Sequence, residues 1–234
     1  MLPIIATPKY EMNVPSTGQT ITYRPYVVKE EKVLLIAMET QSDTAIENAV
    51  TDMIKLCVET PIKINELTNF DVEYIFVTLR SKSVGEGIKV RPKCHECDTE
   101  NETSIDLEKI RVKNLEEQVD KHVKITDDVS VDIQWPTIKN KLTQAERKTE
   151  TDMIINMAAK CLDVIYSGEE IFNAKDSSMK DRVAFVESLS SDHFAKIVEI
   201  ISEAPNLSYD LEFKCKNCGT ENKIELNGLA DFFQ

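Results

Sequence analysis

The sequence predicts an α+β protein with a mainly helical body, short β-hairpins that carry paired cysteines, and an extended N-terminal arm. Three observations lead to this fold class: apolar residues at helical spacing, two Cys-x-x-Cys motifs set between alternating segments, and a proline-rich start. We therefore divide the chain into five parts. They are the arm (1–22), a helical segment (23–87), a first cysteine knuckle with β-hairpins (88–135), a second helical segment (136–206), and a second knuckle with a C-terminal tail (207–234).

The N-terminal arm is predicted to be extended because Pro3, Pro8, Pro15 and Gly18 interrupt any helix. Exposure to water would be costly for its apolar side chains, which are Ile4, Ile5, Tyr10, Met12 and Val14. We therefore expect the arm to dock, either on its own fold or on a neighbouring protein. Docking on its own fold is the favoured arrangement.

Three helices are predicted between residues 23 and 87. The first follows the helical apolar period over residues 27–38, and the second begins at the Ser42–Asp43 cap and ends before Pro61. The third follows residues 67–71 and places Arg80 and Lys82 near its C-terminus, where positive charge favours the helix dipole.

The most distinctive pattern is a repeated element, K-C-x-x-C-x-T-E-N, at Lys93–Asn101 and Lys214–Asn222. Each copy lies between segments in which polar and apolar residues alternate, so each is predicted to be a β-hairpin with two thiols at its bend. The alternating segments are 88–91 and 104–107 for the first copy, and 211–214 and 223–226 for the second.

Between the two knuckles, the pattern changes from strand to helix. Short strands are predicted at 123–125 and 129–133, either as a second hairpin or as an extension of the first. A long helix is expected over 149–166, after a capping-box pair formed by Thr143 and Glu146. Two shorter helices are expected after it, at 179–189 and 192–204.

The four knuckle cysteines, Cys94, Cys97, Cys215 and Cys218, match the ligand set of a zinc ribbon. Two knuckles that face each other would supply four thiolates in a tetrahedron, and thiolates are the ligands that Zn²⁺ prefers in structural sites. A four-thiolate site leaves no open position for water, so its metal does not catalyse. We therefore predict a structural Zn²⁺ as the cofactor.

Two other interpretations of the paired cysteines stay open. Thioredoxin-like redox chemistry needs the Cys-x-x-Cys motif at a helix N-terminus, whereas both motifs here lie between predicted strands. Alternatively, the thiols stay reduced in β-turns and hold no metal. We treat His95 as a surface residue, and Cys57 and Cys161 as core residues, because they lie among apolar residues at helical spacing.

Composition and charge exclude several classes of protein. With 234 residues and 41% hydrophobic content, the chain can bury a sizeable core. It begins without a signal-peptide pattern and has no apolar run long enough to span a bilayer, so we expect it in a reducing cytosol and away from membranes. Its net charge of −13 repels phosphate backbones, so nucleic acid is not expected as a partner.

No catalytic constellation is evident, and we expect the protein not to be an enzyme. His95, His122 and His193 are scattered along the sequence, and no phosphate-binding glycine loop or nucleophile elbow is present. Adjacent acidic residues such as Asp127–Asp128 are more typical of solvated turns than of paired general acids.

Several segments together resemble the baseplate hub proteins and hub assembly factors of T-even-type myophages. The resemblance covers most of the chain and rests on these segments: Thr7–Met12, Pro15–Gly18, Tyr23–Tyr26, Val28–Lys32, Leu67–Asp71 and Leu79–Ser83. No catalytic residue is carried over from that family.

The resemblance implies a phage late protein that acts in tail baseplate assembly through protein–protein contacts. It would be present in the host cytoplasm during assembly and, as a hub component, in the virion tail baseplate. Its implied partners are other tail and baseplate hub proteins, with the tape-measure protein as a further candidate. Two alternatives remain: a chaperone of the tape-measure protein that is absent from the mature virion, and a zinc-ribbon protein that binds nucleic acid or regulates transcription.

Overall fold

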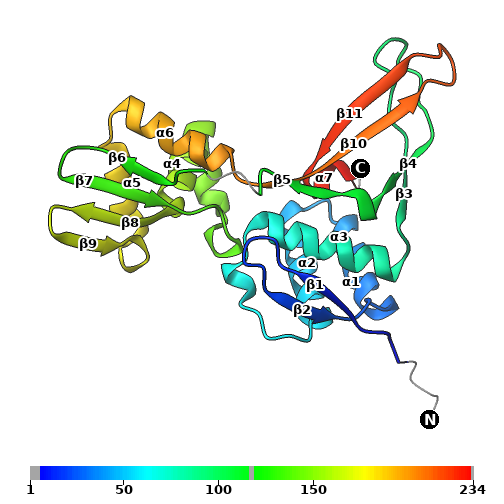
Figure 1. Cartoon of the computed structure of the whole chain (residues 1–234), viewed down its shortest axis with the longest axis horizontal. Helices are drawn as coiled ribbons and strands as arrows, with labels where there is room; N and C mark the ends of the chain where they lie inside the picture. The colour runs from blue at the N-terminus through cyan, green and yellow to red at the C-terminus, as the bar shows by residue number, and fades with distance from the viewer. Residues whose placement is uncertain (1–5, 116–118, 233–234) are drawn as a thin grey trace. The chain divides into compact units, whose positions relative to one another are not determined.

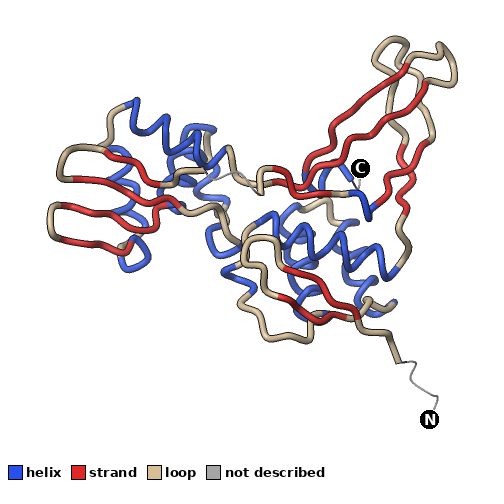
Figure 2. The backbone as a smooth tube through the Cα atoms, viewed as in Figure 1, coloured by secondary structure: helices blue, strands red, loops and turns tan. Residues whose placement is uncertain are grey.

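The computed structural model describes residues 6–115 and 119–232, so Ile4 and Ile5 of the predicted arm lie outside the described residues. The chain forms two compact units (Figures 1 and 2). The first unit takes in residues up to Ile64, Phe70–Leu115, and residues from Pro205 onward. The second takes in Asn65–Asn69 and the residues between Leu115 and Pro205. Helices and several small sheets make this an α+β fold, as the sequence predicts.

The helices of the first unit are α1 (Val28–Glu39), α2 (Asp43–Cys57), α3 (Asn69–Ser83) and the short α7 (Gly228–Phe232). The predicted cap of α2 is confirmed, since Ser42 Oγ accepts a hydrogen bond from the Ala45 N–H at 3.4 Å. Arg80 and Lys82 lie in the last turn of α3, also as predicted. No helix among the described residues has both the length and the apolar character required to cross a bilayer.

The described part of the N-terminal arm is a β-hairpin of β1 (Tyr10–Asn13) and β2 (Thr20–Tyr23). Gly18 allows the turn, because its φ of +68° lies in the left-handed region and its N–H donates to the Val14 carbonyl at 2.8 Å. The arm docks on its own fold, as favoured above, because side chains of this hairpin are buried. The exposed fraction is 8% or less for Met12, Val14, Ile21 and Tyr23.

The remaining strands of the first unit form two small antiparallel sheets. Their members are β3 (Gly87–Val90) with β4 (Thr103–Asp106), and β10 (Asn206–Lys214) between β11 (Glu221–Asn227) and β5 (Arg111–Lys113). Figure 1 shows the β3–β4 and β10–β11 hairpins extending away from α1, α2 and α3. The two cysteine knuckles lie at the tips of these hairpins.

The second unit contains a four-stranded antiparallel meander. Its strands, in spatial order, are β6 (His122–Lys124), β7 (Val129–Ile133), β8 (Leu162–Ser167) and β9 (Glu170–Asn173). The predicted hairpin after the first knuckle is therefore a separate one that belongs to a different sheet. The sequence interpretation missed β9, which follows β8 through a tight turn at Gly168 with φ of +60°.

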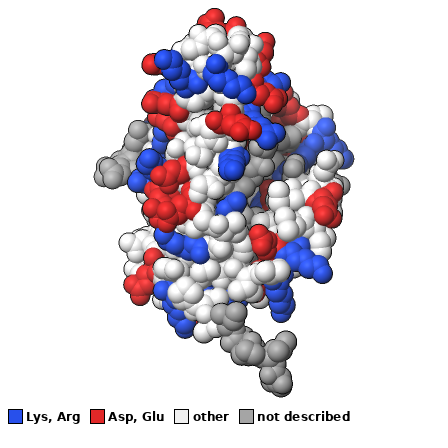
Figure 3. Space-filling model, turned by 90° about the vertical axis from the view of Figure 1, so that its right-hand side faces the viewer, with Lys and Arg blue, Asp and Glu red and all other residues white. Residues whose placement is uncertain are grey.

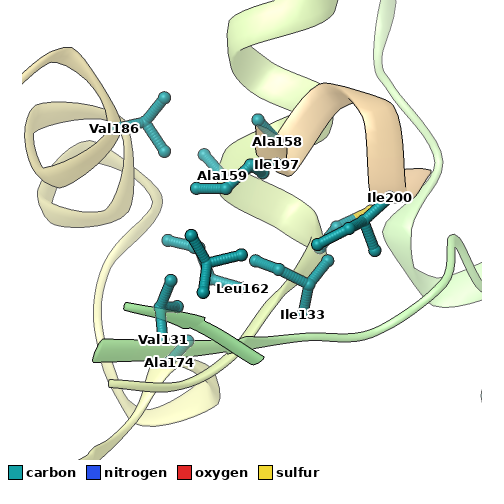
Figure 4. Close-up of a cluster of buried hydrophobic side chains, with 11 residues drawn as sticks. Val131, Ile133, Ala158, Ala159, Leu162, Ala174, Val186, Ile197 and Ile200 are labelled. Atoms are coloured by element: carbon teal, nitrogen blue, oxygen red, sulfur yellow. The ribbon is translucent and has the colours of Figure 1, made fainter. Parts of the chain in front are cut away.

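Helices α4 (Glu150–Cys161), α5 (Met179–Glu187) and α6 (Ser191–Ser202) bury their apolar faces in the core of the second unit. Figure 4 shows side chains of these helices meeting those of β7 and the start of β8. The residues that are fully buried there are Val131, Ala158, Ala159, Cys161, Leu162, Ala174 and Ile197. The second unit thus has a hydrophobic core of its own.

The helix predicted over 149–166 is wrong only at its C-terminal end (162–166), because α4 ends at Cys161 and the chain enters β8 directly. The run Val164-Ile165-Tyr166 is β-branched and aromatic, which favours a strand, and β8 pairs with both β7 and β9. The capping box of Thr143 and Glu146 begins a single 3₁₀ turn, and Thr149 caps α4.

Candidate metal centre

The two knuckles have the same backbone geometry. In the first, the Cys94 N–H donates to the Thr99 carbonyl at 3.0 Å and the Asp98 N–H donates to the Cys94 carbonyl at 2.9 Å. In the second, the equivalent bonds join Cys215 to Thr220 at 2.8 Å and Gly219 to Cys215 at 3.0 Å. The repeated sequence element is therefore a repeated structure.

The residue after the second cysteine of each knuckle adopts a left-handed backbone. This residue is Gly219 in one knuckle, with φ of +75°, and Asp98 in the other, with φ of +52°. Glycine enters this region freely, and Asp is one of the few other residues that tolerate it. The turn places both cysteine side chains of each knuckle on the same side.

The structure brings the four predicted ligands together. The sulfur of Cys97 lies 3.6 Å from that of Cys215 and 3.5 Å from that of Cys218, and the Cys94 and Cys218 sulfurs are 3.7 Å apart. All four sulfurs lie within 4.8 Å of one another. A Zn–S distance of about 2.3 Å places tetrahedral sulfurs about 3.8 Å apart, so the cluster has the dimensions of a four-thiolate metal site.

Hydrogen-bond donors around the sulfurs favour the thiolate form that a metal requires. The Thr99 hydroxyl lies 3.3 Å from the Cys97 sulfur and, with the Thr99 N–H and the Asn217 side chain, lowers the pKa of Cys97 to about 6. Backbone N–H groups, first that of Cys218, also lower the pKa of Cys215. Cys218 differs: the Thr220 hydroxyl acts to lower its pKa, but burial and the contacts with Cys97 and Cys215 leave that pKa raised. The thiolate form is therefore favoured at Cys97 and Cys215 before a metal binds.

The other cysteines and His95 take no part in the cluster. Cys57 and Cys161 are fully buried, as predicted, and burial raises their pKa values to about 11 and about 12. His95 is exposed, and its Nδ1 lies 2.7 Å from Asn222 Oδ1. All six cysteines are free thiols and none forms a disulfide.

Two asparagines at the ends of the repeated elements were assigned no role from the sequence, although the repeat itself marks them. Asn101 and Asn222 are 4% and 3% exposed. Asn101 Oδ1 accepts a hydrogen bond from the Lys216 N–H at 2.8 Å, and Asn222 Oδ1 accepts one from the His95 N–H at 3.0 Å. Each asparagine therefore joins its own knuckle to the opposite one.

The cluster can hold an ion but offers no surroundings for catalysis at it. Four sulfur ligands fill a tetrahedral coordination shell, so no position remains for a substrate or a reactive water. Cys94 and Cys215 are buried, and only Cys218 is exposed. An ion held by these four sulfurs would therefore act as a cross-link between the two hairpins.

Comparisons with known proteins give one match. The family described as "T4 bacteriophage base plate protein" matches residues 7–234, which is nearly the full length of the chain. No curated protein and no solved structure shows significant similarity to the chain.

Proposed function

Because the chain belongs to the family of T4 bacteriophage base plate proteins, we propose that it acts in the baseplate hub through protein–protein contacts and not as an enzyme. Zinc held by Cys94, Cys97, Cys215 and Cys218 would be structural. Family membership associates the chain with the virion tail and with other baseplate proteins as partners. The hub position and the host cytoplasm as the site of assembly are parts of the proposal.

The observation that carries the proposal is the apolar surface of α1. Large apolar side chains on this helix remain strongly exposed: Val28 by 78%, Val33 by 52%, Leu35 by 53%, Ile36 by 51% and Met38 by 41%. The opposite face of α1 packs against the rest of the protein, since Glu30 and Ala37 on that face are buried. Lys29, Lys32 and Glu39 are exposed among these apolar side chains. Five large apolar side chains left exposed on one helix suit contact with another subunit.

A comparison of affinity purifications tests the proposed contact. Tagged protein from infected cells should recover hub or tape-measure proteins, identified by mass spectrometry. The double variant Leu35→Glu and Ile36→Glu should lose them, because it places charge in the apolar contact. Ile171→Glu on β9 is the matched control, since Ile171 is 66% exposed in the second unit.

Three results of that purification would contradict the proposal. They are recovery of polymerase or DNA in place of tail proteins, unchanged recovery by the α1 variant, and equal loss by the Ile171 control.

Mass spectrometry of purified virions distinguishes between the two proposed roles, a hub component and a chaperone of the tape-measure protein. A hub component is found in them, whereas a chaperone of the tape-measure protein is absent.

The zinc assignment is tested by elemental analysis of protein purified without chelator. About one equivalent of zinc is expected for a single four-cysteine site, and Cys94→Ser and Cys218→Ser should each lower it. Cys57→Ser is the control, since that thiol lies in the apolar core away from the cluster. Less than roughly half an equivalent in the unchanged protein would argue against the site.

The described residues on the face drawn in Figure 3 do not favour the nucleic-acid alternative. Basic and acidic side chains alternate over the face in Figure 3, which carries no continuous basic stripe. A nucleic-acid interface needs such a stripe to neutralise phosphates.

A further inference from the structure

The two knuckles are held together by hydrogen bonds that involve neither a cysteine side chain nor a metal. Asn101 Oδ1 accepts from the backbone N–H of Lys216, and Asn222 Oδ1 accepts from the backbone N–H of His95. Each amide group also donates back to its own knuckle, to the carbonyl of Thr99 at 2.7 Å or of Thr220 at 2.9 Å. Each asparagine therefore spans the two halves of the centre.

The two hydrogen bonds between the knuckles are related by symmetry. Lys216 and His95 both directly follow the first cysteine of a knuckle, and the two asparagines both close the repeated element. An approximate twofold axis therefore relates the two bonds and passes through the group of four sulfurs. These two bonds explain the asparagine that closes each copy of the repeat and is not itself a metal ligand.

The energetics make these bonds independent of the ion. Both asparagine side chains are buried, and a buried amide or N–H group that loses its partner costs free energy. The bonds use only backbone and amide groups, so no metal ligand takes part in them. The bonds hold two distant segments of the chain next to each other. Without them, the binding of an ion would have to offset the entropy cost of ordering these segments.

We propose that Asn101 and Asn222 are positioning residues that assemble the four-sulfur site before the metal binds. The inference deepens the zinc site given under the proposed function and rests on it. The asparagines act through the placement of the knuckles, because neither side chain is a ligand. Asn101 lies beside the cluster, with Nδ2 at 3.8 Å from the Cys215 sulfur.

The test measures amide hydrogen exchange in metal-free, reduced protein. In the unchanged protein, the amides of His95 and Lys216 should be protected. Asn222→Ala should abolish protection at His95 and spare Lys216, and Asn101→Ala should do the reverse. A general loss of stability cannot produce this crosswise pattern, because it would lower protection throughout the first unit.

Zinc affinity, measured by competition with a chelator, provides the second readout. Each single variant should bind zinc about 10–100-fold more weakly, the usual effect of removing a group that supports a metal ligand. Asn206→Ala is the matched control, since Asn206 is an exposed asparagine on β10 in the same hairpin, and it should change neither readout.

Several outcomes would overturn the inference. Unprotected amides at His95 and Lys216 in the metal-free protein would mean that the knuckles meet only around the ion. Wild-type zinc affinity in both variants would remove the positioning role. Failure of the unchanged protein to bind zinc would instead overturn the metal site, while the crosswise exchange would still decide whether the asparagines join the knuckles.

Discussion

Glu73 on α3 is a largely buried carboxylate beside the start of α7. Burial raises its pKa from 4.5 to about 7, although the Leu229 N–H donates to it and acts in the opposite direction. A Cβ at Gly228 would lie 3.5 Å from Glu73 Oε1, so the carboxylate and the α7 backbone are closely packed. The folded protein thus holds a proton on Glu73 at a pH where the unfolded chain has lost it.

The stability of the protein should therefore carry a pH dependence from Glu73. Because the folded pKa is raised, the contribution of this group to the free energy of unfolding falls as pH rises from about 4.5 to about 7. Glu73→Gln has no charge to bury, so its stability relative to the unchanged protein should increase across that window. Urea unfolding followed by circular dichroism at intervals in the window measures the difference.

Glu225→Gln is the control for this prediction. Lys113, 2.6 Å away on β5, lowers the pKa of Glu225, so any contribution of that group is lost below the window and not within it. If Glu73→Gln and the unchanged protein keep parallel stabilities from pH 4.5 to 7, the Glu73 carboxyl is not protonated in the folded state.

The sequence identified the four cysteines that the structure brings together, but not the asparagines that join the two knuckles. Paired Cys-x-x-Cys motifs commonly bind metal, and the thioredoxin-like alternative needs a helix N-terminus that neither motif has, so the spacing of the cysteines was enough to select them. Asn101 and Asn222 each bond to a residue in the opposite half of the chain. A contact between segments so far apart in the sequence produces no local periodic pattern. The only sign of it in the sequence is that the asparagine recurs at the same position of both repeats.

Among the elements, the N-terminal hairpin depends on one buried carboxylate. Asp71 on α3 is fully buried and accepts hydrogen bonds from the Ser16 N–H at 2.8 Å and the Ser16 hydroxyl at 2.6 Å. Ser16 lies in the turn that joins β1 to β2. The hairpin is therefore fixed to α3 at its tip as well as through its apolar side chains.

Loss of this anchor should loosen the hairpin. Ser16→Ala removes one hydrogen bond to a buried charge, so the protein should lose about 1.5–3 kcal/mol of stability. Thr17→Ala is the matched control, since Thr17 lies in the same turn and makes only an exposed contact with the Gln19 N–H. Limited proteolysis should cleave Ser16→Ala faster within residues 6–23, and equal cleavage of both variants would contradict the anchor.

The boundaries of helices and strands were predictable where the sequence contains a capping residue or a clear alternation of polar and apolar residues. Ser42 begins α2, and the alternating segments beside each Cys-x-x-Cys pair are strands. The end of α4 was not predictable from apolar spacing, because Cys161, Leu162 and Ile165 satisfy a helical period as well as a buried strand does. Leu162 and Ile165 lie in a strand and not a helix because β8 pairs with β7 on one side and β9 on the other.

The division into two units sets the response of the chain to metal removal. Chelation should speed amide exchange at Cys94–Asp98 and Cys215–Gly219, while the amides of His95 and Lys216 keep part of their protection through the asparagines. The strands of the second unit should be unaffected, because their core contains none of the four knuckle cysteines. Exchange measured by mass spectrometry before and after chelation checks this.

The Cys94→Ser variant is the control, since chelator should change its exchange little. Faster exchange in β6–β9 after chelation would contradict the independence of the two units, and no change at either knuckle would contradict a bound metal. The sequence did not indicate these units, because the first unit is assembled from separated parts of the chain and no linker composition marks the junctions.

The separated parts of the first unit affect the order in which the protein can fold as it is synthesised. α1, α2 and the first knuckle leave the ribosome early, whereas β10, β11 and the second knuckle come after the entire second unit. The second unit can fold on emergence, since domains fold as units during translation. The first knuckle cannot meet the second until β10 and β11 have been made. A chain interrupted after Ala204 lacks Cys215 and Cys218, so it cannot form the four-cysteine cluster.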